Sequence, residues 1–212
     1  MDVGCGWGGT AHYMAENYGV EVVGVTISAE QAKLAKDKCR NLPVDIRVQD
    51  YRKLQGSFDR VVSIGMFEHV GYKNFRTYFK KINELLKDDG LFLLHTIGGN
   101  TPAKRTDPWI ERYIFPNGMI PSSQQISSAF EGYFVLEDWH NFGLDYDKTL
   151  MKWHENFENS WSDLQVNYDE RFRRMWKYYL LACAGSFRAR ENQLWQIVLS
   201  KQGLSGEYSF PR

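Results

Sequence analysis

Short runs of aliphatic and β-branched residues alternate with helical stretches over the first half of the chain. Such alternation is typical of α/β proteins, in which each helix returns the chain to the next strand of a parallel sheet. We therefore expect the 212 residues to form a single domain with an α/β, Rossmann-like, doubly wound and mostly parallel sheet. The expected strands are 1–4, 20–26, 44–48, 58–64 and 91–97, and the expected helices are 10–17, 29–39 and 74–86.

Local signals mark boundaries within this alternation. Ser28 followed by Gln31 predicts a capping box at the start of the second helix, and residues 88–90 predict a turn after the third. Residues 98–121 lack a regular pattern but are aromatic, and irregular segments of this length are usually functional, so we expect an ordered excursion at the active site. Beyond it we expect strands at 133–139 and 194–200 and helices at 147–161 and 168–190.

The glycine-rich run that begins at Gly4 restricts which cofactors this sheet can bind. Gly4, Gly6 and Gly9 satisfy the dinucleotide fingerprint, which also expects an acidic residue at the end of the second strand, but that strand ends at Thr26. Asp2 instead completes the Asp-x-Gly-x-Gly-x-Gly pattern of S-adenosylmethionine-binding enzymes. The pattern favours S-adenosylmethionine, with a nicotinamide cofactor and a plain strand-to-helix turn as the weaker alternatives.

Two further features bear on this site. Asp50 directly follows the third expected strand, where its carboxylate can meet an adenine amino group, because ligands of open α/β sheets bind at the carboxyl ends of the strands. Only residues 1–3 precede the glycine run, and a full strand takes about five or six residues. We expect that the chain begins inside its first strand and that further sequence precedes it.

Composition argues against several classes of partner. Lys and Arg together number 26, as do Asp and Glu, so no net charge would draw the chain to nucleic acid. Cys5, Cys39 and Cys183 are odd in number and lack the spacing of a metal site, and neither a signal peptide nor a long apolar run is present. We expect a protein of the reducing cytoplasm that binds no metal and touches membranes only locally.

Several segments resemble the cyclopropane-fatty-acyl-phospholipid synthase family, and together they span nearly the whole chain. Residues 2–9, 23–31 and 49–52 are similar to the cofactor motifs of that family. Residues 138–143 resemble its phospholipid-modifying branch more than its mycolic-acid branch. The remaining segments that carry the resemblance are 65–70, 95–98, 113–118, 145–147 and 182–185.

The resemblance implies a fold and an activity. The fold is the seven-stranded sheet of class I S-adenosylmethionine-dependent methyltransferases, with its first strand cut short, the family's N-terminal domain absent and residues 147–190 forming a helical cover over the acyl-chain site. The activity is transfer of a methylene group from S-adenosylmethionine to the cis double bond of a phospholipid acyl chain, which forms a cyclopropane ring, with bicarbonate as the base. The implied location is the cytoplasmic side of the inner membrane, and the implied assembly is a homodimer.

The resemblance also implies particular site residues. Glu68, His95, the backbone of Ile97 and Tyr146 would hold the bicarbonate, together with a cysteine that lies upstream of the glycine run in the family, and Cys183 would be a further catalytic residue. The implied cofactor-binding residues are Asp2, Gly4, Cys5, Gly6, Gly8, Thr26, Ser28, Gln31, Gln49, Asp50 and Tyr51.

The residue chemistry agrees with the assignment of the base site. Glu68 follows the fourth strand, His95 ends the fifth and Tyr146 follows the strand at 133–139, so all three can converge at the carboxyl edge of the sheet. A carboxylate, an imidazole and a phenol can orient a small oxyanion in a cavity that excludes water. No step of this chemistry needs a thiolate, so Cys183 fits a packing role equally well.

The aromatic helical stretches 152–161 and 171–179 fit a core, a lid over an acyl chain or a membrane-facing surface. The basic residues among and after them suit phospholipid head groups or a solvated face. Two other functions stay open at this point: a small-molecule S-adenosylmethionine methyltransferase, and a cofactor- or lipid-binding fragment without activity. The basic residues are Arg171, Arg173, Arg174, Lys177, Arg188 and Arg190.

Overall fold

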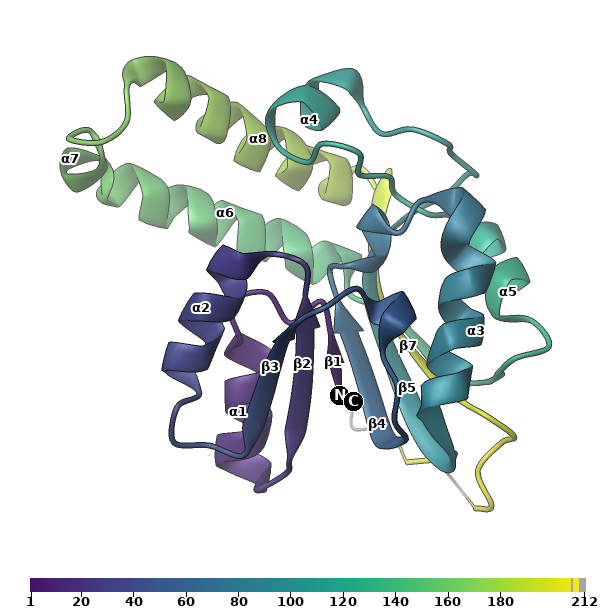
Figure 1. Ribbon diagram of the computed structural model, residues 1–212. Helices are drawn as coiled ribbons and strands as arrows, with labels where there is room; N and C mark the ends of the chain where they lie inside the picture. The colour runs from purple at the N-terminus through teal and green to yellow at the C-terminus, as the bar shows by residue number, and fades with distance from the viewer. Residues whose placement is uncertain (207, 210–212) are drawn as a thin grey trace.

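A seven-stranded sheet in the order β3-β2-β1-β4-β5-β7-β6 forms the centre of the molecule in a computed structural model that describes residues 1–206 and 208–209 (Figure 1). Strands β1 to β5 are parallel, and β7 runs antiparallel to both of its neighbours, β5 and β6. The predicted mostly parallel, doubly wound sheet is confirmed. The strands are β1 (Asp2–Val3), β2 (Val22–Thr26), β3 (Val44–Val48), β4 (Phe58–Ile64), β5 (Leu86–Gly99), β6 (Val135–Asn141) and β7 (Asn192–Ser200).

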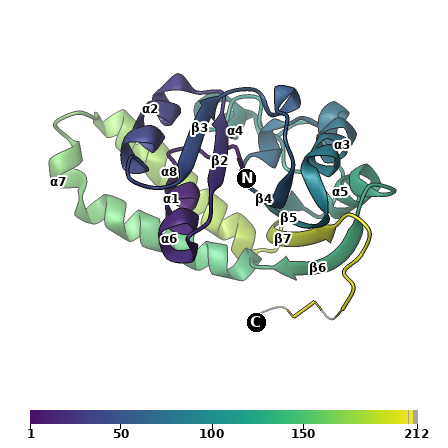
Figure 2. The same cartoon turned by 60° about the horizontal axis from the view of Figure 1, so that its bottom comes forward.

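Helices cover both faces of the sheet, and a third group stands over the carboxyl ends of the parallel strands (Figures 1 and 2). α1 (Gly9–Tyr18) and α2 (Ala29–Lys38) lie on one face, and α3 (Phe75–Leu85) and α5 (Ser123–Phe130) lie on the other. The group at the carboxyl edge comprises α4 (Pro108–Tyr113), α6 (Gly143–Asn159), α7 (Trp161–Leu164) and α8 (Glu170–Arg188). Short 3-10 turns are η1 (Tyr51–Lys53), η2 (Phe67–His69) and η3 (Tyr72–Asn74).

The two faces of the sheet are packed differently. α3 presents a stripe of large side chains at helical spacing, and each such burial contributes about 1.5 to 3 kcal/mol. α1 and α2 meet the sheet through alanines, so these helices lie close to the strands. The buried stripe of α3 is Phe75, Tyr78, Phe79, Ile82 and Leu85, and the alanines are Ala11, Ala15, Ala32 and Ala35.

The helices at the carboxyl edge have a hydrophobic core of their own. α6 and α8 lie side by side and project beyond the sheet, with α7 at the far end (Figures 1 and 2). Between them Phe157, Leu180 and Phe187 are buried, and Leu194 at the start of β7 joins the same cluster. No helix in the part of the chain that the structure describes is long and apolar enough to cross a bilayer.

Local predictions at two helix boundaries are wrong. The turn predicted at residues 88–90 lies inside β5, because Leu86 already pairs with Phe58 and residues 87–90 bulge out before pairing resumes between Leu91 and Arg60. The predicted capping box is only half formed, because the Ser28 side chain accepts the Gln31 N–H but the Gln31 side chain does not bond back to Ser28. α5 was not predicted, because its sequence is mostly polar and its buried stripe is short.

Candidate active site

Glycines with positive φ build the turn between β1 and α1. The φ angles are 81° at Gly4, 52° at Gly6 and 77° at Gly8, in the left-handed region that other residues rarely adopt. A Cβ on Gly4 would lie 2.6 Å from Cγ of Met66, whereas a Cβ on Gly6 would meet no atom within 4 Å. The turn is therefore closely packed at Gly4 and open at Gly6. α1 begins without a capping side chain, which leaves its first backbone N–H groups available to a ligand.

Asp2 lies directly before this turn and is almost fully buried. Burial raises the pKa of its carboxyl to about 6. Its Oδ2 atom has no hydrogen-bond partner among the residues that the structure describes. A buried carboxylate oxygen without a partner is costly, so this atom fits a role as an acceptor for a ligand.

The ends of β2 and β3 are tied together by hydrogen bonds around Thr26. Its backbone carbonyl accepts from the N–H of Gln49 at 2.9 Å, and its hydroxyl donates to Oε1 of Gln31 at 2.8 Å. Ser28 accepts the N–H of Gln31 as predicted, at 3.2 Å. The Gln31 side chain is bonded to Thr26 and does not return to the Ser28 N–H, so the predicted capping box is incomplete. Ile27, which sequence analysis missed, is 82% exposed at this edge.

Asp50 lies at the predicted place after β3, but its carboxylate is already engaged. Arg52 forms a bidentate ion pair with it, with a shortest distance of 2.6 Å between Nη2 and Oδ2. This pairing lowers the pKa of Asp50. Arg52 is exposed, and exposed pairs contribute little, about 0 to 1 kcal/mol, so a ligand can compete for the carboxylate. Tyr51 is half-buried with its ring edge-on to Tyr78.

Cys5 belongs to the packing of the turn. Its side chain is buried in the cluster between the sheet and helices α1 and α2. A Cβ on Gly24 would lie 3.1 Å from the Cys5 sulfur, which shows how tightly the thiol fills this space. The thiol faces this core, and cofactor binding by Cys5 stays a prediction.

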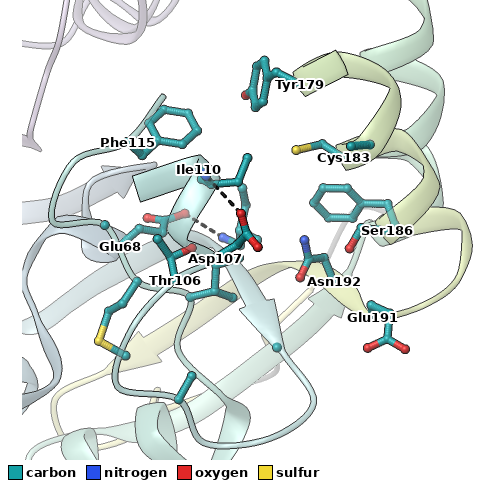
Figure 3. A pocket seen from close by; sticks show the side chains of 18 of the residues that line it. Glu68, Thr106, Asp107, Ile110, Phe115, Tyr179, Cys183, Ser186, Glu191 and Asn192 are labelled. Carbon is teal, nitrogen blue, oxygen red and sulfur yellow. Dashed lines mark hydrogen bonds between the residues drawn. The ribbon is translucent and has the colours of Figure 1, made fainter. Parts of the chain in front are cut away.

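A cavity of about 710 Å³ lies between the carboxyl edge of the sheet and the helices above it. Figure 3 shows Glu68 and Phe115 on one side, and Tyr179, Cys183 and Ser186 from α8 on the other. The walls come from η2, β5, the 98–121 excursion, α6 and α8, and many are aromatic or aliphatic. The apolar lining includes Ile97, Trp109, Ile110, Phe115, Met119, Leu150, Tyr179 and Phe187.

Glu68 is the buried acid of this cavity. Its Oε1 accepts the N–H of Ile97 at 2.8 Å, and its backbone carbonyl accepts the N–H of Met119 at 2.8 Å, which ties η2 to β5 and to the excursion. Its Oε2 is buried and has no partner within the described chain. Burial raises the pKa of the Glu68 carboxyl.

Tyr146 and Cys183 face the same cavity from the helical cover. Tyr146 lies in the first turn of α6, which begins earlier than predicted, and its ring packs edge-on against Phe187 at 5.0 Å between centroids. Burial raises the pKa of the Tyr146 phenol and raises the pKa of the Cys183 thiol to about 11. Both groups are therefore protonated at neutral pH, and Cys183 lacks the thiolate that a nucleophile needs.

His95 is the one predicted base-site residue that does not line the cavity. Its Nδ1 lies 3.2 Å from Nε2 of Gln196 on the neighbouring strand, and burial lowers the pKa of its imidazole. The backbone of Ile97 was also predicted to hold the base, and its N–H is bonded to Glu68. His69 does line the cavity, and its position next to Glu68 was the available signal for it.

The sheet order and the glycine turn after its first strand define this molecule as a class I S-adenosylmethionine-dependent methyltransferase domain. Solved structures agree. The cyclopropane synthase MmaA2 from Mycobacterium tuberculosis matches with a TM-score of 0.87 and 28% identity, covering 94% of this chain and 76% of that chain. The mycolic acid cyclopropane synthase CmaA1, complexed with SAH and CTAB, matches with a TM-score of 0.86 and 30% identity, covering 94% of this chain and 76% of that chain.

The chain belongs to the mycolic acid cyclopropane synthetase family, whose model matches residues 1–197. It is 60% identical over 201 residues to the cyclopropane-fatty-acyl-phospholipid synthase of Escherichia coli K12, covering 95% of this chain and 53% of that protein. It is 31% identical to cyclopropane mycolic acid synthase 2 of Mycobacterium leprae, over 95% of this chain and 74% of that protein. The predicted family is confirmed, and the chain spans about half the length of its E. coli relative.

Proposed function

We propose that this chain carries the catalytic site of an S-adenosylmethionine-dependent lipid cyclopropane synthase, which acts on the cis double bond of a phospholipid acyl chain. The observation that carries the proposal is the cavity of about 710 Å³, with apolar and aromatic walls and the buried acid Glu68, at the edge of the sheet where the glycine turn lies. The lining also includes charged residues, Arg105, Asp107 and Glu191, so the acyl chain is favoured by the aromatic and aliphatic residues around Glu68.

The glycine turn and its surroundings fit S-adenosylmethionine. The open backbone at Gly6, the unpartnered Oδ2 of Asp2 and the uncapped start of α1 would hold its methionine and ribose portions. Ile27 would lie against the adenine ring, and Asp50 would accept from its amino group. When bound, S-adenosylmethionine supplies an electrophilic methyl group.

The cavity walls have two tasks in such a reaction. They exclude water, which would otherwise trap a carbocation, and they align the double bond, which is a poor nucleophile by itself. The faces of Phe115, Tyr146 and Tyr179 can stabilise positive charge that develops on the acyl chain. The aromatic cover would thus act on the lipid, and the glycine turn on the cofactor.

The groups around Glu68 would manage the proton that ring closure releases. The raised pKa of Glu68 allows it to hold a proton at Oε2, and the Tyr146 phenol is a second donor on the same cavity. These two groups fit a small oxyanion, and we propose bicarbonate as that base. Ile97 and His95 contribute less, because the Ile97 N–H is already bonded and His95 lies outside the lining. Peripheral membrane contact on the cytoplasmic side and a homodimer stay predictions.

The direct test is to incubate the purified chain with S-adenosylmethionine, bicarbonate and vesicles of an oleoyl phospholipid, and to analyse the fatty acids by mass spectrometry. We expect a product heavier by one CH₂ unit that resists hydrogenation, and a slower reaction when bicarbonate is removed. The same assay is run in parallel on a longer gene product that includes any residues preceding Met1. A methylated but unclosed product from both samples would contradict the proposal.

Cofactor choice is tested separately by calorimetry. We expect S-adenosylmethionine or its demethylated product to bind more tightly than NAD, and Asp50→Ala to weaken that binding by about 1 to 3 kcal/mol if a buried hydrogen bond is lost. Arg52→Ala is the control, because it frees the Asp50 carboxylate and should not weaken binding. Tighter binding of NAD would overturn the assignment of the site.

A further inference from the structure

A second, smaller cleft of about 250 Å³ lies between α4 and the first half of α8. We propose that this cleft binds the phosphate group of the phospholipid whose acyl chain enters the larger cavity. The inference rests on the proposed function, since it concerns the same substrate. The cleft is lined by Trp109, Tyr113, Arg171, Arg174, Met175 and Tyr178.

Helical spacing gathers the α8 residues of the cleft on one face. Arg171, Arg174, Met175 and Tyr178 stand at positions i, i+3, i+4 and i+7, so their side chains share one side of the helix. The same helix continues into the larger cavity, where Cys183 lies on the wall. Arg174 and Cys183 are separated by roughly 13 Å along the axis, at about 1.5 Å per residue. A ligand lying along α8 would therefore reach from the arginines into the larger cavity.

The structure separates these two arginines from the other basic residues of the region. Arg173 and Lys177 pair with Glu158, at 2.9 and 3.5 Å, and Arg188 pairs with Asp147 at 2.9 Å. Arg190 donates to Gln193 at 2.8 Å. Among the described residues, Arg171 and Arg174 are the two of the six basic residues predicted to suit head groups whose side chains make no ion pair or hydrogen bond.

The cleft and the larger cavity share a wall. Trp109 and Tyr178 line both, and their rings meet edge-on with centroids 4.6 Å apart. One side of this aromatic pair faces the arginines and the other faces the apolar cavity. A molecule with a phosphate at one end and a long apolar chain would satisfy both sides at once.

The chemistry of the cleft selects a phosphate on a lipid. A guanidinium offers paired N–H donors that match phosphate oxygens, and two guanidiniums one helical turn apart can hold one phosphate from two sides. Aromatic side chains beside them suit the boundary between a head group and its chain. The chain as a whole has no net charge, and two arginines are too few to follow a nucleic-acid backbone.

The test compares two double variants by their binding to vesicles of palmitoyl-oleoyl phosphatidylglycerol, measured by sedimentation. Arg171→Gln with Arg174→Gln should weaken binding by about tenfold or more, because two charge-assisted contacts are lost. Lys33→Gln with Lys36→Gln removes the same charge at the same spacing on the exposed side of α2, and should leave binding within about twofold. Lysine at 171 and 174 should give an intermediate affinity, because the charge stays but the paired donors are lost.

Turnover distinguishes this inference from the function on which it rests. The arginine double variant should raise the KM for the phospholipid vesicles but leave kcat unchanged with methyl oleate in a neutral detergent, which has no phosphate. Wild-type affinity and KM in that variant would overturn the phosphate site and leave the proposed function standing. Loss of vesicle binding in the variant, with no ring product from the wild type, would support the phosphate site and refute the function.

A final arm separates a lipid phosphate from a free one. Glycerol 3-phosphate should compete with the vesicles only weakly, because it lacks the chain that fills the larger cavity. Complete displacement at concentrations equal to the lipid would show that the cleft binds free phosphate esters, and would overturn the lipid assignment.

Discussion

The glycine turn and the larger cavity lie at the same edge of the sheet but are built in opposite ways. The turn presents backbone groups, with positive φ at Gly4, Gly6 and Gly8, and close packing leaves no room for a side chain at Gly4 or Gly8. The cavity presents side chains, most of them large, from segments that are far apart in the sequence. A ligand recognised by backbone needs a few residues next to one another, whereas a shaped cavity needs walls from several elements.

The two regions also differ in how they treat ionisable groups. Near the glycine turn the two carboxyl groups differ: pairing with the exposed Arg52 lowers the pKa of Asp50, whereas burial raises the pKa of Asp2 to about 6. In the cavity, Glu68 and Tyr146 are partly buried and have no basic partner among the described residues, and partial burial raises both pKa values. The first region suits charge recognition in partial contact with water, and the second suits proton handling where water is excluded.

The largest expected effect is a loss of turnover when Glu68 in the cavity is substituted. Glu68→Gln keeps the shape of the side chain but cannot exchange a proton, so turnover should fall by about 10² to 10⁴-fold while affinity for S-adenosylmethionine changes little. His95→Gln should lower turnover much less, because His95 contacts Gln196 and does not line the cavity. Turnover with saturating lipid and cofactor binding by calorimetry measure the two effects. Equal losses of turnover in the two variants would show that His95 acts in the reaction as much as Glu68 does.

The next effect concerns the backbone of the glycine turn. Gly8→Ala should lower the free energy of unfolding by about 3 kcal/mol, because it combines a strained φ with overpacking. Its Cβ would lie 2.8 Å from Cβ and 3.0 Å from Cα of Ala35, and the backbone atom cannot move aside.

Gly19→Ala is the matched control for that substitution. Gly19 also has a positive φ, of 62°, but a Cβ there would meet no atom within 4 Å, so only the cost of φ, about 1 kcal/mol, should remain. Denaturant unfolding of both variants checks the difference. Equal losses would mean that close packing under the turn contributes nothing.

A smaller effect is expected from the pH dependence of Asp2. Its pKa is about 6 in the folded chain against 3.8 without burial, so the folded state holds this proton more tightly than the unfolded state does. The contribution of Asp2 to the free energy of unfolding is fully present below pH 3.8. It is lost as the pH rises through about 6, and the loss amounts to about 2 to 3 kcal/mol. Asp2→Asn should remove that part of the pH dependence and stabilise the chain at pH 7, while weakening cofactor binding. Urea unfolding from pH 4 to pH 7 measures the free energy of unfolding of the wild type and of Asp2→Asn. The same dependence of this free energy on pH in both proteins would refute the prediction.

Predictions from sequence succeeded where one element determines the outcome. The alternation of strands and helices, the glycine turn and the place of Asp50 follow from residues that are close together in the chain. Residues of the 98–121 segment and of α6 and α8 line the cavity, but the roles of these segments as an active-site excursion and an acyl-site cover stay predictions. Individual wall residues such as Trp109, Phe115 and Leu150 were not predicted, because nothing local distinguishes an aromatic residue that lines a cavity from one that fills a core.

The alternation of strands and helices determined the class of fold, because periodicity is a local property of the chain. The resemblance of short segments such as 2–9 and 23–31 identified the family. Only the tertiary structure decided that His95 contacts Gln196 and that Glu68 bonds Ile97. It also decided that Arg173 pairs with Glu158, whereas the side chains of Arg171 and Arg174 have no partner among the described residues. The physical reason is that a side chain's partners depend on which distant elements pack against it. Strand register and helix packing fix those neighbours, and the linear pattern does not contain them.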